Sequence, residues 1–141
     1  MDRNDCIFFQ LAKVNQLAGK FLGQKVAALN ITPVQALVLN ILNHADHITA
    51  SELGKMTELD SATLTGIIDR LEAAELIERR TNPVDRRSIR IHLTQKGITV
   101  SSQAALMIAK ANQEFLKDVS ETQKRDLFKI IEKIRQQKIK A

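Results

Sequence analysis

The sequence predicts a mainly α-helical single domain, residues 1–141, that carries one small β-hairpin. Three observations support this fold class. Apolar side chains recur at steps of three and four residues along most of the chain, which is the spacing of amphipathic helices. Helix-capping patterns precede several of these stretches. The apolar period shortens to two only between residues 76 and 93, as expected of short strands.

The composition is that of a folded domain. It is 44% hydrophobic, enough to bury a core. No run approaches the ~20 apolar residues of a membrane span, and the N-terminus lacks a basic and apolar leader, so we expect a cytoplasmic protein without a membrane partner. Cys6 is the only cysteine, which excludes an internal disulfide and a zinc-ribbon framework. We expect no cofactor.

The charge favours an acidic partner. The net charge is +5, which by itself is weak support for nucleic-acid binding. Residues 79–90, however, hold five arginines and one acidic residue, Asp85, a local excess of 5 − 1 = +4. A second basic run, Lys124 to Lys140, is interrupted by Asp126 and Glu132 at helical spacing, and we interpret it as a solvated helix face.

The first half of the chain predicts four helices. An apolar stripe over residues 7–29 indicates a long N-terminal helix. Thr32, followed by Pro33, begins a helix that runs to about residue 43, and Thr49 begins a short one that ends near Thr57. Asp60 is the expected cap of the next helix. The turn between the last two is only about three residues long, so these helices should cross steeply as a helix-turn-helix.

The helix after Asp60 has two distinct faces. Its apolar positions are Leu64, Ile67, Ile68 and Leu71, which should point inward. The opposite face, with Ser61, Ala62, Thr65, Gly66 and Asp69, is small and polar, which is unusual for an ordinary protein surface.

The second half predicts a hairpin and two helices. Residues 76–80 and 88–93 have strand patterns, and the loop between them, 81–87, contains an Asn-Pro turn signal. A hairpin directly after such a helix is a wing. Thr94 and Ser120 are the expected caps of the last two helices. The apolar side expected for the first of these holds Ile98, Ala105, Ile108, Phe115 and Val119, and the second should bury Leu127, Ile130, Ile131 and Ile134.

Residues 31–97 resemble the MarR family. The resemblance is carried by ordered stretches, among them Ile31-Thr32-Pro33-Val34-Gln35-Ala36, Leu53-Gly54, Leu59-Asp60-Ser61-Ala62-Thr63-Leu64-Thr65, Asp69-Arg70-Leu71-Glu72, Asp85-Arg86-Arg87 and Leu93-Thr94-Gln95-Lys96-Gly97. One position departs, because the family often has glycine where Glu75 stands. If that residue adopts a left-handed conformation, its side chain costs about 1 kcal/mol.

The resemblance implies a winged helix-turn-helix regulator that binds double-stranded DNA. Short polar side chains near a helix N-terminus suit base edges in the major groove, and the candidates are Ser61, Thr63, Thr65 and Arg70. Ala62 and Gly66 would allow close approach, with Ala62 able to touch a thymine methyl group.

The loop of the wing supplies the other candidates. Arg86 is expected at the tip, where it would enter the minor groove, with Arg87 beside it. We expect Asp69 to orient an arginine such as Arg87, and Asp85 to stiffen the loop.

One helix and one wing cover only half a site, so a homodimer on a pseudo-palindromic operator is expected. Residues 31–97 would form the DNA-binding lobe, with dimerisation helices in 5–30 and 98–141. The resemblance also implies a repressor that responds to a small-molecule effector bound between the two parts.

Three alternative hypotheses concern redox sensing, metal sensing and protein interaction. Cys6 lies roughly where the hydroperoxide-sensing branch places its reactive cysteine, but that branch uses tyrosines and this chain has none, and the following Ile7-Phe8-Phe9 equally suits a buried, inert thiol. A metal-sensing site is not indicated, because His44, His47 and His92 lack a convincing partner set and are expected at the surface.

The third alternative is a protein-interaction module with the same fold. An enzyme is not expected, because no phosphate-binding loop, catalytic triad or metal cluster is recognisable.

Overall fold

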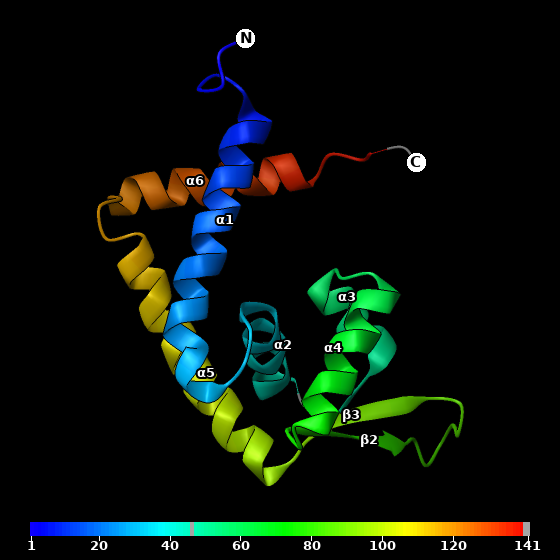
Figure 1. The fold of residues 1–141 in the computed structure, drawn as a ribbon. Coiled ribbons are helices and arrows are strands. Elements are labelled where there is room, and N and C mark those ends of the chain that lie inside the picture. Colours follow the sequence, from blue (N-terminus) through cyan, green and yellow to red (C-terminus); the bar gives the residue numbers. More distant parts are fainter. Residues whose placement is uncertain (46, 140–141) are drawn as a thin grey trace.

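The computed structural model describes residues 1–45 and 47–139 (Figure 1), so Lys140, the end of the second basic run, lies outside the described residues. The architecture is mainly helical with one small sheet, as predicted. The helices are α1 (Ile7–Val26), α2 (Pro33–His44), α3 (Ala50–Thr57), α4 (Ser61–Ala73), α5 (Gln95–Phe115) and α6 (Glu121–Arg135), with a 3₁₀ turn η1 (Ala27–Leu29) after α1. The strands are β1 (Ile48–Thr49), β2 (Ile77–Thr81) and β3 (Ile89–Leu93).

The predicted caps begin the predicted helices. The N-cap residues of α2 to α6 are, in order, Thr32, Thr49, Asp60, Thr94 and Ser120. At α2, the Gln35 amide donates to the Thr32 hydroxyl over 3.2 Å, and the Gln35 side-chain oxygen accepts from the Thr32 amide over 2.9 Å. Such reciprocal bonds satisfy donors that a helix start leaves open, which explains why these boundaries were readable from the sequence.

The sheet has three strands instead of the two predicted. Its order is β1-β3-β2, with β2 and β3 forming the predicted hairpin. The additional strand β1 pairs Ile48 with Ile91 and Thr49 with Arg90. A strand of two residues is too short to show an alternating apolar pattern. Its pairing partners on β3 lie more than 40 positions along the chain, so β1 forms only through tertiary pairing.

The core lies where α2, α3 and α4 meet the sheet. The inward positions predicted for α4 are all buried, and they pack with Leu39, Leu42, Leu53 and Ile91. Helix α5 differs from its prediction, because its buried positions are small residues: Gly97, Ser101, Ala104 and Ala111. Small side chains let α5 approach α2 closely, whereas Ile98, expected inside, is exposed.

Two backbone details connect α4 to α5. Glu75 has φ 60°, which confirms the left-handed conformation considered for this position. Its carbonyl accepts a 2.6 Å hydrogen bond from the Thr94 hydroxyl. Gly97 lies so close to the Leu76 carbonyl that a Cβ there would come within 1.8 Å of the oxygen, so only glycine fits at this contact.

Two helices, α6 and the outer half of α1, expose rows of apolar side chains, and both lie away from the wing (Figure 1). The predicted burial of the α6 side chains is wrong within one chain, since Leu127, Ile130, Ile131 and Ile134 are exposed, as is Phe128. The outer half of α1 exposes Ile7, Phe8, Leu11, Val14 and Leu17.

Among the described residues, no single helix is long and apolar enough to span a membrane. One bent pair, α1 with η1 followed by α2 at 69°, has the length and composition of a span.

The expected surface position of the three histidines is wrong for His92. His92 is buried, at 8% exposure, and its ring lies 4.1 Å from that of His47. Strand β3 turns this position inward against the turn before β1, whereas His44 and His47 are exposed as expected.

Candidate nucleic-acid interface

The polar face of α4 is open to solvent. Ser61, Ala62, Thr63, Thr65, Asp69 and Arg70 are exposed and Gly66 is half-buried, while the four apolar positions of the helix are buried. The helix follows α3 after a three-residue turn, 58–60. The candidate residues predicted on α4 therefore share one accessible surface.

The start of α4 is held by Asp60. Its carboxylate accepts from the Thr63 amide at 2.8 Å and from the Thr63 hydroxyl at 2.6 Å. These hydrogen bonds, the hydroxyl first, lower the pKa of Asp60 below its ordinary value. The Thr65 hydroxyl donates to the Ser61 carbonyl at 2.8 Å. Both threonine hydroxyls thus use their protons within the helix and present acceptor lone pairs outward.

Grooves flank the exposed face of α4 on both sides. One of about 380 Å³ runs between α4 and the start of α2, and brings Thr32 and Gln35 beside Ala62, Gly66 and Arg70. The other, of about 510 Å³, lies between α3 and α4 and includes Ser51 and Lys55. Sequence reasoning missed these neighbours, because capping explained Thr32 and Gln35 fully and helix crossing alone brings Lys55 to this surface.

An arginine clamp fastens the wing to α4. Arg79 on β2 donates from Nη1 to Glu72 at 2.7 Å, forms an ion pair with Asp69 through Nη2, and donates its backbone N–H to Glu72 at 3.1 Å. These partners, Asp69 first, raise the pKa of Arg79. We expected Asp69 to orient an arginine such as Arg87. In the structure its ion-pair partner is Arg79 instead. The i, i+3 spacing of Asp69 and Glu72 makes a two-carboxylate cradle that faces β2.

The loop of the wing is ordered by its own side chains. Asp85 accepts a 3.0 Å bond from the Arg87 amide, and Asn82 accepts a 3.1 Å bond from the Val84 amide, both of which are Asx turns. Asp85 therefore has the local contact expected of a residue that stiffens the loop.

The five arginines of this region divide into two groups. Arg79 is clamped, Arg80 pairs with Glu78, and Arg90 donates to the His47 carbonyl at 2.9 Å. Arg86 and Arg87 are exposed, and no carboxylate within residues 1–45 and 47–139 pairs with either side chain. These two guanidiniums are the available cations of the wing.

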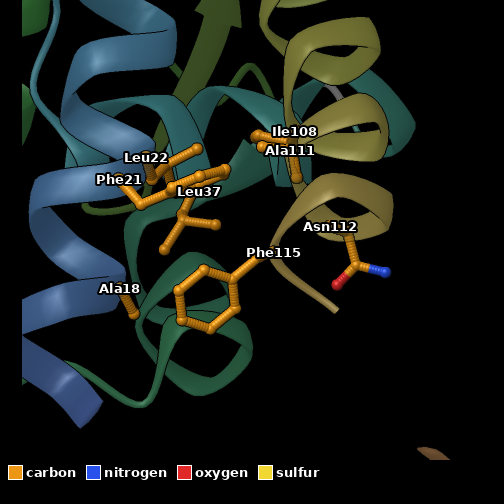
Figure 2. Close-up of a pocket in the computed structure, with 8 residues that line it drawn as sticks. All are labelled: Ala18, Phe21, Leu22, Leu37, Ile108, Ala111, Asn112 and Phe115. Atoms are coloured by element: carbon orange, nitrogen blue, oxygen red, sulfur yellow. The ribbon is translucent and has the colours of Figure 1, made fainter. Parts of the chain in front are cut away.

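A separate cavity lies between α1, α2 and α5. It has a volume of about 200 Å³ and is lined by Ala18, Phe21, Leu22, Leu37, Ile108, Ala111, Asn112 and Phe115 (Figure 2). The Phe21 and Phe115 rings contact each other with centroids 5.3 Å apart. Cys6, the other candidate for sensing, is not part of this cavity; it is the half-buried N-cap residue of α1.

The fold and this surface define a winged helix-turn-helix DNA-binding protein: two helices joined by a three-residue turn, an exposed polar face on the second helix, and a hairpin whose loop arginines are exposed. The chain belongs to the MarR family. The model of that family matches residues 31–89, and the multiple antibiotic resistance protein MarR of Escherichia coli K12 is 30% identical over 122 residues, which cover 86% of this chain and 85% of that protein.

Solved structures agree with this assignment. A cysteine-to-serine mutant of E. coli MarR complexed with operator DNA superposes with a TM-score of 0.85 at 29% identity, over 95% of this chain and 99% of that one. The PcaV transcriptional regulator of Streptomyces coelicolor, solved with its natural ligand, has the same fold, with a TM-score of 0.86 at 23% identity over 96% and 95% of the two chains. The protein is thus a DNA-binding transcriptional regulator of the MarR family.

Proposed function

We propose that the chain acts as a homodimeric, effector-responsive repressor that binds a pseudo-palindromic operator and catalyses no reaction. The observation that carries the proposal is the exposed polar face of α4, which stands beside a wing whose Arg86 and Arg87 have no carboxylate partner among the described residues. The DNA-binding lobe would be residues 31–97, acting in the cytoplasm, where the operator is.

On this proposal α4 enters the major groove. Ser61, Thr63 and Thr65 would present hydroxyl oxygens to base edges, which suits the exocyclic amino groups of adenine and cytosine. Ala62 and Gly66 would let the backbone come close, and Arg70 would bind a guanine edge or a phosphate. The clamp of Arg79 on Asp69 supports this arrangement, because it neutralises a carboxylate that would otherwise repel the phosphates.

Arg86 would enter the minor groove from the wing, with Arg87 on the adjacent backbone. A narrow minor groove has an enhanced negative potential that attracts a guanidinium. The Asx turns at Asn82 and Asp85 lower the entropic cost of this contact, because they order the loop before it binds.

The exposed apolar faces of α1 and α6 support the homodimer. Large apolar side chains are exposed along both helices, for example Phe8 at 79% and Phe128 at 55%, and contiguous exposed apolar patches typically mark protein–protein interfaces. Dimerisation through residues 5–30 and 98–141 would cover these side chains. Light scattering at micromolar concentration should then give 2 × 15.8 = 31.6 kDa; a mass of one chain would contradict the dimer.

The cavity between α1, α2 and α5 supports the effector response. It is bounded by two helices of the proposed dimerisation part and by α2 of the DNA-binding lobe. A ligand that fits better in one arrangement of these parts would change the spacing of the two α4 helices.

Operator binding is tested by selecting bound sites from fragmented source DNA and titrating the selected duplex. Affinity should fall by orders of magnitude between ~50 and ~200 mM salt, because binding to many phosphates releases counterions. Arg86→Ala should weaken binding without unfolding the protein, whereas Arg3→Ala, the same charge loss ahead of α1, should not. Salt-independent binding, or equal loss in both variants, would contradict the proposal.

The two rival hypotheses predict different results. An apolar protein-interaction module would show no steep salt dependence and no selected DNA. Redox sensing by Cys6 predicts that mild peroxide releases operator from the wild type and not from Cys6→Ser, and equal loss in both would exclude it.

A further inference from the structure

The C-terminal end of α4 is hydrogen-bonded to the N-terminal end of α5, beside which it lies (Figure 1). Three successive carbonyl groups directly follow α4, those of Ala74, Glu75 and Leu76, and each accepts a hydrogen bond from the start of α5. The Lys96 ammonium donates to the first over 3.1 Å. The Thr94 hydroxyl donates to the second over 2.6 Å, and the Thr94 amide to the third over 3.1 Å. We call these five residues the joint.

The joint satisfies both helix ends at once. The Thr94 hydroxyl, besides donating to Glu75, accepts from the Gly97 amide at 2.9 Å as the cap of α5. Glu75 ends α4 with a left-handed backbone, φ 60°. The Gly97 backbone lies against the Leu76 carbonyl with no room for a side chain. Hydrogen bonds and close packing together therefore fix the angle between α4 and α5.

Lys96 takes part in the joint although α5 itself does not need it. Its side chain is exposed on the first turn of α5, and its ammonium reaches a carbonyl 22 positions earlier in the chain. The last carbonyls of a helix lack partners within the helix and carry the negative end of its dipole, so an ammonium group there is stabilising. Removing this ammonium should loosen the joint and leave α5, which Thr94 caps, intact.

The angle at the joint decides where α4 lies in the proposed dimer. The first turn of α5 belongs to the proposed DNA-binding lobe, 31–97, and the rest of the helix to the proposed dimerisation part. Helix α4 is packed within the lobe through four buried apolar side chains. A change of angle at the joint therefore turns the lobe, and α4 with it, relative to the partner chain.

We propose that Lys96, together with the Thr94 hydroxyl, is a positioning residue that fixes the distance between the two α4 helices and so selects the spacing of the operator half-sites. This role rests on the homodimer and operator proposed above and adds the residues that set the spacing. One base pair more or less moves a half-site by about 3.4 Å and turns it by about 34° around the duplex. A stiff joint cannot follow this displacement, and a loosened joint can.

The test compares three duplexes: the selected operator and two copies with one base pair inserted or deleted at the centre. Fluorescence anisotropy at constant salt should show the wild type binding the selected spacing at least about tenfold more tightly than either altered one. Lys96→Met keeps the length of the side chain without its ammonium, and should lower this ratio at least about threefold. The ratio is the readout because a change in the folded fraction affects all three duplexes equally.

Lys55→Met is the matched control. Lys55 is an exposed lysine of the same lobe, on α3 in the groove beside α4, and it lies outside the joint. Loss of its charge should weaken binding to all three duplexes by the same factor, so the ratio stays at the wild-type value. Thr94→Val, which lacks the hydroxyl, should lower the ratio as Lys96→Met does.

Several results would overturn the positioning role. These are an unchanged ratio in both Lys96→Met and Thr94→Val, an equal fall in Lys55→Met, and a wild type that binds the three spacings alike. In each of these cases the operator is still bound, so the proposed function stands. A wild type that binds none of the duplexes would contradict the proposed function and this role together.

Discussion

Replacing Gly66 by alanine separates the stability of α4 from its contact with DNA. Gly66 lies in the middle of the helix on its accessible side, and a Cβ built there has no heavy atom within 4 Å. Alanine costs less backbone entropy than glycine in a helix, so the variant should be more stable by about 0.5–1 kcal/mol. For a chain of this size that raises the unfolding temperature by roughly 2–4 °C.

The same methyl group should weaken operator binding. If α4 lies in the major groove, the added Cβ occupies space that the DNA needs, and overpacking of a close contact costs about 1–3 kcal/mol. This corresponds to about a 5- to 150-fold loss per half-site, measured by fluorescence anisotropy on a selected duplex.

Gly19→Ala is the control, since its Cβ also has no neighbour within 4 Å and it lies on α1. It should gain similar stability, which identifies the part of the Gly66→Ala effect that belongs to helix propensity alone. If Gly66→Ala binds DNA as tightly as the wild type, α4 does not approach DNA through this face.

Three further predictions concern the scaffold. Gly97→Ala should lower the free energy of unfolding by at least about 3 kcal/mol, measured by urea titration, because its Cβ would overlap the Leu76 carbonyl; a loss under about 1 kcal/mol would show that this contact yields easily. Glu75→Gly should be more stable than Glu75→Ala by about 1 kcal/mol, since only glycine relieves the left-handed strain, and equal stabilities would argue against that conformation. The lowered pKa of Asp60 means that its contribution is fully present above about pH 5 and is lost as the pH falls through the folded pKa. Thermal unfolding of Asp60→Asn, which keeps a cap without the charge, should therefore depend less on pH in this range, and identical pH profiles would refute the assignment.

Local chemistry made much of the fold predictable. Caps such as Thr32 and Asp60 are satisfied within three or four residues, so the sequence contains the whole interaction. Parts that depend on distant segments were not predictable: β1 exists because Ile48 pairs with Ile91. In α5 the pattern favoured large apolar residues, whereas close helix packing buried small ones such as Ala104.

In the candidate site, too, the features set by local periodicity were predictable and those set by distant segments were not. The outward face of α4 follows from helical periodicity once Leu64 and Ile67 are assigned to the core. The partner of Asp69 did not follow, because the spacing of α4 from β2 selects Arg79 over the loop arginines. The apolar stripe of α6 predicted burial, and its side chains are exposed in the single chain, since a periodic stripe does not specify which molecule covers it.

A hydroxyl-radical footprint of the full chain on its selected operator tests the paired, two-fold arrangement most directly. Two protected patches on one face of the duplex, centred about 10 base pairs apart, are the result expected of two α4 helices in successive major grooves. A single protected patch, or protection unchanged when Arg86 is replaced by alanine, would contradict it.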